Sequence, residues 1–204
     1  MSGPLRADAH PIEVESYAIL RTRLDVSDLP PLHRAVVERV VHTTADPSWA
    51  GDLVCDEDAL RAGRAALLDG APLVTDVRMV AVGVTARPAI VAIDLPGVRE
   101  LAGAEDLTRS AAGIRLAVRQ HRVGAVWAIG NAPTALAELV RCVEAGLVAS
   151  PLVVGLPVGF VGAVAAKAAL RAAGVGSVSN RSERGGAAPA AAAVNTLLHA
   201  GVDG

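Results

Sequence analysis

The chain has 204 residues, a net charge of −2 at neutral pH, and 52% hydrophobic residues. Gly, Pro or a charged residue interrupts each apolar stretch before the roughly 18 residues that a membrane span requires, which argues against a membrane protein. The near-neutral charge and an aromatic content of only 2% argue against nucleic acid as a partner.

The first half of the chain predicts helices that alternate with short strands. Residues 12–24 and 31–44 have helical patterns, and Ser27 or Asp28 is expected to cap the second helix. Residues 56–70 begin with acidic side chains and end in glycine, as helices commonly do. The strands expected here are residues 53–55, 72–75 and 89–94.

The second half continues this alternation. We expect strands at residues 125–129, 152–155 and 177–179, and helices at residues 108–122, 133–145, 161–173 and 188–198. Such alternation predicts an α/β protein with a mostly parallel, Rossmann-like sheet in a three-layer α/β/α arrangement. The length predicts a single domain over residues 1–204, with flexible ends at about 1–8 and 201–204.

Glycine-marked segments follow the last three predicted strands, at residues 126–135, 153–162 and 180–186. Because ligands bind at the carboxyl ends of strands in open α/β sheets, these segments predict one shared pocket. The nucleotide motifs GxxxxGK[ST] and GxGxxG are absent, and so is the hydrolase motif GxSxG. The five histidines are scattered singly, so no metal site is predicted.

His42 lies near the end of a predicted helix, beside Thr43 and Thr44. The carboxyl end of a helix favours a protonated imidazole, so His42 is a candidate general acid. The alternative is that His42 only caps its helix or lies in solvent.

Arginine side chains supply candidate anion receptors. Thr108 to Ser110 begin a predicted helix, where backbone N–H groups, two hydroxyls and the guanidinium of Arg109 can together bind an anion. Arg115, Arg119 and Arg122 recur along the same helix, and this spacing is more typical of a solvated face.

Six sequence blocks, in order along nearly the whole chain, carry a family resemblance: HPIEVESYAILRTRLDVSDLPPLHRAVVERVVHTTADP, DVRMVAVGVT, LTRSAAGIRLA, AIGNAPTAL, GLPVGFVGA and NRSERGGAAPAAAAVN. The chain resembles the precorrin-8X methylmutases of cobalamin biosynthesis, also called cobalt-precorrin-8 methylmutases. The resemblance implies an isomerase that moves a methyl group from carbon 11 to carbon 12 of a corrin-type ring, giving hydrogenobyrinic acid or its cobalt counterpart. It implies no cofactor and no catalytic metal, and it identifies His42 as the catalytic residue that protonates or hydrogen-bonds the pyrrole system.

The implied substrate is a large, flat, mostly apolar tetrapyrrole fringed by carboxylates. Its pocket requires close approach of the backbone, which glycines allow, and polar contacts at the rim. Each glycine also has an ordinary explanation as a turn or helix-cap residue. The residues expected to bind the substrate are Tyr17, Arg21, Thr85, Arg109, Ser110, Gly130, Asn131, Thr134, Gly155, Gly159, Arg184, Gly185 and Gly186.

The resemblance also implies a homodimer with substrate sites close to the subunit interface. Two cysteines without a CxxC motif, and an N-terminal segment without an apolar signal core, favour a cytoplasmic location. Two alternatives stay open: a Rossmann-like methyltransferase or nucleotide-binding enzyme, and a non-catalytic tetrapyrrole-binding protein.

Overall fold

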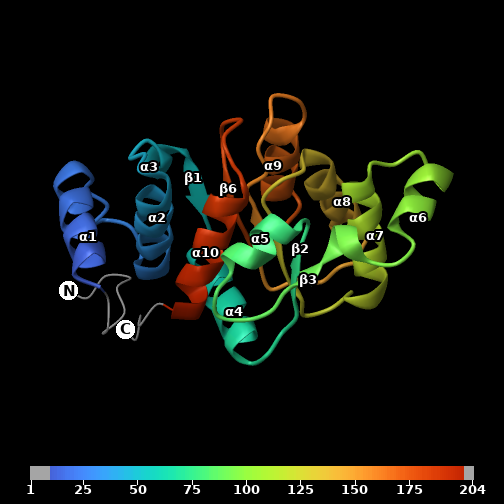
Figure 1. Cartoon of the computed structure of the whole chain (residues 1–204), viewed down its shortest axis with the longest axis horizontal. Helices are drawn as coiled ribbons and strands as arrows, with labels where there is room; N and C mark the ends of the chain where they lie inside the picture. Colours follow the sequence, from blue (N-terminus) through green and yellow to red (C-terminus); the bar gives the residue numbers. More distant parts are fainter. Residues whose placement is uncertain (1–9, 200–204) are drawn as a thin grey trace.

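The computed structural model describes residues 10–199, in which helices cover both faces of a central sheet (Figure 1). The ends expected to be flexible, 1–8 and 201–204, lie outside the described residues. The strand order is β1-β6-β5-β4-β2-β3, and every neighbouring pair is parallel except β1 and β6. This confirms the predicted α/β class and mostly parallel sheet. The strands are β1 (Leu53–Cys55), β2 (Leu73–Thr75), β3 (Ile90–Val91), β4 (Val126–Ile129), β5 (Val153–Gly155) and β6 (Ser177–Asn180).

The seven predicted helices are all present, with ends that differ from prediction by at most two residues. The short helices α3, α5 and α6 were not predicted, because four to seven residues are too few to show a helical period. No helix within residues 10–199 is long and apolar enough to cross a membrane. The helices are α1 (Pro11–Arg23), α2 (Pro31–Thr44), α3 (Trp49–Asp52), α4 (Glu57–Leu68), α5 (Arg78–Gly83), α6 (Val98–Ala104), α7 (Arg109–Gln120), α8 (Pro133–Glu144), α9 (Ala163–Ala172) and α10 (Ala187–His199).

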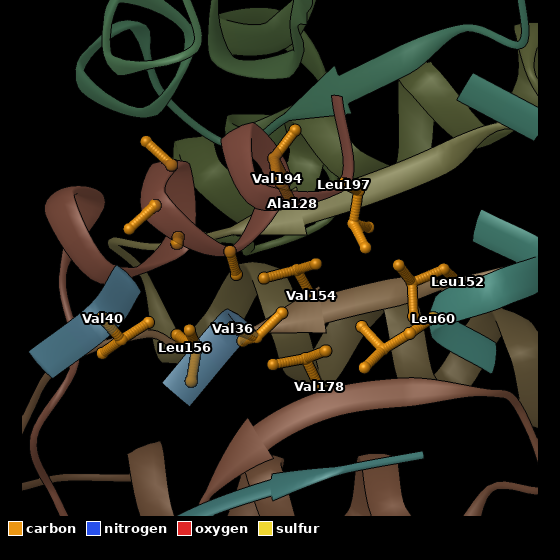
Figure 2. Close-up of a cluster of buried hydrophobic side chains, with 14 of the residues drawn as sticks. Val36, Val40, Leu60, Ala128, Leu152, Val154, Leu156, Val178, Val194 and Leu197 are labelled. Carbon is orange, nitrogen blue, oxygen red and sulfur yellow. The ribbon is translucent and has the colours of Figure 1, made fainter. Parts of the chain in front are cut away.

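Successive residues of the central strands face opposite helical layers, because side chains alternate along a strand. Ala128 and Val154 belong to a core with α2, α4 and α10 (Figure 2). Trp127, Ile129 and Val153 belong to a second core with α7, α8 and α9. Both faces of the sheet are therefore buried, which explains why its strands read as continuous apolar runs. Helix α1 packs on α2 at one end of the molecule (Figure 1).

The start of α2 is capped by a residue from α4, not by Ser27 or Asp28 as predicted. The carboxylate of Glu57 accepts hydrogen bonds from the backbone N–H groups of Leu32, at 3.2 Å, and His33, at 2.8 Å. A negative charge is favourable there, because the amino end of a helix carries a partial positive charge. The cap comes from a distant segment, so the local sequence does not show it.

The strand predicted at residues 89–94 is shorter in the structure. Only Ile90–Val91 pairs with the sheet, and the chain then turns into the 3-10 helix η1 (Ala92–Asp94). Helix α7 packs directly on this turn, since a Cβ atom at Gly113 would lie 2.6 Å from the carbonyl oxygen of Ala92. The N–H of Ile93 still donates to the carbonyl of Asp76 at 3.2 Å, just beyond the last paired residues of β2 and β3, while residues 92–94 already have 3-10 geometry.

The arginine stripe of α7 is not a uniformly solvated face. Arg115 donates two hydrogen bonds, of 2.7 and 3.0 Å, to the buried carboxylate of Glu138 on α8, and it also binds Glu105. Burial opposes ionisation of Glu138, yet hydrogen bonds from Arg141 and Arg115 lower its pKa to about 2. The prediction of a solvated stripe is therefore wrong for Arg115. It holds α7 against α8, whereas the side chain of Arg119 remains 57% exposed.

Candidate active site

The three glycine-marked loops meet at the carboxyl ends of β4, β5 and β6, as the sequence predicts. The N–H of Gly159 donates to the carbonyl of Glu183 at 3.0 Å, and the N–H of Gly186 donates to that of Leu156 at 2.9 Å. A Cβ atom at Gly130 would lie 2.9 Å from the carbonyl oxygen of Gly186. The loops therefore form one continuous surface at this edge of the sheet.

Three of the five glycines expected to bind substrate are required by packing within the protein itself. A Cβ atom at Gly155 would lie 2.5 Å from a methyl group of Leu170, and one at Gly185 would overlap the carbonyl oxygen of Leu156. Gly130 is enclosed in the same way. Their lack of side chains is explained without a ligand.

Gly159 and Gly186 are different, because a Cβ atom at either position would make only ordinary van der Waals contacts. Their φ angles are +153° and +132°, and no atom lies closer to a Cβ built there than 3.4 Å and 3.8 Å respectively. Such φ values favour glycine. These two positions therefore allow a ligand to approach the backbone closely.

Asp76, which the sequence analysis did not single out, holds the loop after β4. It lies directly after β2 and is fully buried. Its carboxylate accepts hydrogen bonds from the N–H groups of Gly130, at 3.1 Å, and of Asn131 and Ala132, at 2.9 Å each. Burial raises its pKa, and these N–H groups oppose that change. An acid immediately after a predicted strand was the available signal for this residue.

The first turns of α7 and α8 lie side by side at the rim. Thr108 caps α7 with its hydroxyl, which is also 2.8 Å from the hydroxyl of Thr134 at the start of α8. Arg109 is exposed and lines a cavity of about 340 Å³ together with Asp94. Ser110 is half-buried beside it. Polar groups therefore gather where the sequence placed an anion receptor, with two carboxylates, those of Asp94 and Glu100, among them.

His42, in the last turn of α2, is held by α1. Its Nδ1 is 3.0 Å from the hydroxyl of Ser16, and its ring stacks on that of Tyr17 with centroids 4.6 Å apart and planes 13° from parallel. The ring lines a small cavity of about 120 Å³. Burial, followed by the positive charge of Arg39, lowers the pKa of His42, while Glu13 opposes this. The expectation that the helix end favours the protonated form is therefore wrong for the free protein.

Tyr17 and Arg21 make contacts that support the position of His42, and of the two only Tyr17 is buried. The Tyr17 side chain has no exposed area, and burial raises its pKa to about 12. The guanidinium groups of Arg21 and Arg39 lie 5.7 and 5.5 Å from the centre of its ring. Arg21 also donates two hydrogen bonds, of 3.0 and 2.8 Å, to Glu38 of α2. These contacts fasten α1 to the face of α2 that carries His42.

The guanidinium of Arg184 binds other side chains of the protein. It donates hydrogen bonds to Asp46 at 2.5 Å, to the hydroxyl of Ser48 at 2.6 Å and to Asp52 at 3.1 Å. It also stacks over Trp49, 4.9 Å from the ring centre. Arg184 therefore ties the loop after β6 to the segment that follows His42.

Thr85 lies on another side of α2 from His42. Its N–H donates to the side-chain oxygen of Asn195 at 3.1 Å, and the amide nitrogen of Asn195 donates to the carbonyl of Gly83 at 2.7 Å. Thr85 lines a cavity of about 370 Å³ that also includes Thr43. The structure thus places the expected site residues in four separate groups: the loops, the starts of α7 and α8, the Thr85 cavity and the His42 cavity.

Comparison with known proteins identifies one family. The family model described as precorrin-8X methylmutase matches residues 11–200. The cobalt-precorrin-8 methylmutase of Methanothermobacter thermautotrophicus is 38% identical over 97% of this chain and 96% of its own length. The precorrin-8X methylmutase of Pseudomonas aeruginosa is 40% identical, over 93% and 95% respectively. A solved precorrin-8X methylmutase from Thermus thermophilus has a TM-score of 0.84 and 30% identity, covering 93% of this chain and 96% of that chain.

Proposed function

The chain belongs to the precorrin-8X methylmutase family, and on that premise we propose that it moves a methyl group from carbon 11 to carbon 12 of precorrin-8X or cobalt-precorrin-8. The product is hydrogenobyrinic acid or its cobalt counterpart, cobyrinic acid. Methylmutases are isomerases, and this activity belongs to cobalamin biosynthesis. The observation that carries the proposal is the family match over residues 11–200. An isomerisation balances its own atoms and electrons, so the proposed step needs no redox cofactor.

In this proposal His42 is the acid. The hydroxyl of Ser16 engages Nδ1, which leaves Nε2 for the substrate. Stacking on Tyr17 fixes the plane of the ring. The pKa of His42 is low in the free protein, and nearby carboxylates of a bound tetrapyrrole raise it, because negative charge favours the imidazolium. Proton donation to the pyrrole system makes the ring electron-poor, which assists migration of the methyl group, and the proton returns afterwards.

The proposed substrate-binding residues contribute in three ways: by leaving room for the ring, by holding neighbouring residues in place, or by contacting carboxylates directly. Gly159 and Gly186 allow the ring to approach the backbone, and the tight packing at Gly130, Gly155 and Gly185 sets the shape of the loops. Tyr17, Arg21 and Arg184 act through the neighbours that they hold in place. The residues proposed to contact peripheral carboxylates directly are Thr85, Arg109, Ser110, Asn131 and Thr134.

We also propose a homodimer in which residues 1–204 act as one catalytic domain. Apolar side chains next to the site support it: Phe160 is 98% and Val161 88% exposed beside Gly159, and on α5 Met79 is 65% and Val82 81% exposed. Apolar patches of this kind commonly mark interfaces. Light scattering should give the mass of two chains, and Phe160→Glu should lower it to one. A wild-type mass of one chain at every concentration would refute the dimer.

The decisive experiment adds precorrin-8X with carbon-13-labelled methyl groups to the purified full chain. We expect the absorption spectrum to change to that of hydrogenobyrinic acid, the mass to stay constant, and one methyl resonance to move. His42→Ala should bind hydrogenobyrinic acid but not turn over.

Other outcomes identify the alternatives. A spectral change on binding without formation of the isomer would indicate a tetrapyrrole-binding protein. Calorimetric binding of S-adenosylmethionine with methyl transfer would indicate a methyltransferase. Normal turnover by His42→Ala would mean that another residue is the proton donor.

A further inference from the structure

A buried lysine on α9 anchors the loop of residues 180–186 through hydrogen bonds. Lys167, on α9, is the only lysine of the chain and has no exposed surface. Its Nζ donates to the side-chain oxygen of Asn180 at 2.8 Å and to the carbonyl oxygens of Ser182, at 2.5 Å, and Arg184, at 2.8 Å. An ammonium group has three donors, and all three end on this loop.

Asp52 holds the same loop from the side of α3. One carboxylate oxygen accepts from the N–H groups of Arg181, at 2.9 Å, and Ser182, at 2.8 Å. The other accepts from the amide of Asn180 at 2.8 Å, the hydroxyl of Ser182 at 2.6 Å and the guanidinium of Arg184 at 3.1 Å. Burial opposes ionisation of Asp52, and the bonds from Ser182 and Asn180 lower its pKa to about 2. The hydrogen-bond donors of the loop therefore stabilise the ionised form of Asp52.

We infer that Lys167 and Asp52 are positioning residues, which hold the tetrapyrrole-contacting loop of residues 180–186 in its binding conformation before substrate arrives. The inference rests on the proposed function. Arg184 extends the same connection to Asp46, four residues after His42. The loop that allows close approach at Gly186 and the segment after the proposed acid are thereby fixed to each other. A loop ordered during folding does not have to lose conformational entropy on binding, so affinity is gained.

A buried polar cluster can also act only on stability, and a matched control separates the two roles. Glu57 is a carboxylate that likewise accepts two backbone N–H groups, those of Leu32 and His33. It lies at the opposite end of α2 from His42. Glu57→Gln therefore removes a similar charge and similar bonds without touching the loop.

The first measurement titrates hydrogenobyrinic acid by absorption and follows turnover of precorrin-8X in Asp52→Asn, Lys167→Met and Glu57→Gln. We expect the Kd and KM of both loop variants to rise by about tenfold or more, the effect of losing one or two charge-assisted hydrogen bonds. Their kcat should fall less, because His42 is unchanged. Glu57→Gln should lower Tm but keep Kd within about twofold. An unchanged Kd in folded Asp52→Asn and Lys167→Met, or an equal rise in the control, would overturn the inference.

The second measurement is hydrogen exchange of the loop amides that donate hydrogen bonds within the protein, those of Arg181, Ser182, Arg184 and Gly186. In the wild type without ligand they should already be protected, and hydrogenobyrinic acid should add little. Fast exchange that slows only on binding would overturn the inference without any variant. In Asp52→Asn and Lys167→Met, exchange of these amides should be about tenfold faster or more, with no such change in Glu57→Gln. A wild type that protects the loop but neither binds nor converts precorrin-8X refutes the proposed function and not the anchoring.

Discussion

Tyr17 offers a direct test of how the His42 region is built. Its hydroxyl is buried, and within residues 10–199 it has no hydrogen-bond partner. Its ring, by contrast, makes several contacts: it stacks on His42, and the guanidinium groups of Arg21 and Arg39 lie over it in cation–π contacts. Tyr17→Phe removes the hydroxyl and keeps the ring, so it isolates the cost of the unpaired polar group.

The magnitude follows from burial of that group. A buried hydroxyl without a partner costs about 1–3 kcal/mol, so we expect Tyr17→Phe to raise the free energy of unfolding by about 1 kcal/mol. For a chain of this length that corresponds to an increase in Tm of about 2–4 °C. Tyr17→Leu, which loses the stacked ring, should instead lower the free energy of unfolding by about 2 kcal/mol or more.

Thermal unfolding followed by circular dichroism, with urea titration at pH 7, gives both values. At that pH the Tyr17 hydroxyl is neutral, since its ordinary pKa of 10.0 already lies above pH 7 and burial raises the pKa further, to about 12; no charge effect therefore enters. Turnover of Tyr17→Phe should stay near that of the wild type, since the ring still supports His42. A Tm below that of the wild type would refute the reasoning, because it would mean that the hydroxyl has a stabilising partner.

Three further predictions concern protonation and the glycines. The pKa of Asp52 is about 2 in the folded protein against an ordinary 3.8, so its stabilisation is present above the ordinary value and lost as pH falls toward 2. Urea titrations at descending pH should show a smaller acid-induced loss in Asp52→Asn; equal losses would contradict this. Because burial lowers the pKa of free His42, kcat/KM should decrease with rising pH at a pH below the ordinary pKa of a histidine, and kcat should decrease at higher pH than kcat/KM; a flat kcat/KM profile would argue against an imidazolium acid. Gly155→Ala, whose Cβ meets a methyl of Leu170, should lose about 1–3 kcal/mol of stability. Gly159→Ala, whose Cβ would make only ordinary contacts but at a φ of +153° that strains any side chain, should lose more tetrapyrrole affinity than Gly155→Ala, and the reverse order in binding titrations would contradict its role.

The sequence by itself determined the elements that depend on local pattern. The bounds of α2 and β1 agree with prediction, because helical periodicity and short apolar runs are local properties. The convergence of the three glycine-marked loops also followed from sequence, since parallel strands in one sheet bring their carboxyl ends to the same edge. The family was recognisable from ordered blocks along the chain, and the match over residues 11–200 confirms it.

Only the tertiary structure decided which partners the polar residues find. The predicted β3 was too long, because packing by α7 turns the chain at Ala92. Asp76 binds N–H groups 54 to 56 residues away, and Asp52 binds Arg184 across 132 residues. Periodicity reports a residue's neighbours along the chain and nothing about such distant contacts. For this reason the sequence could propose His42 and the loops as candidates, whereas folding determined that burial lowers the pKa of His42 and that Asp46, Ser48 and Asp52 bind the guanidinium of Arg184.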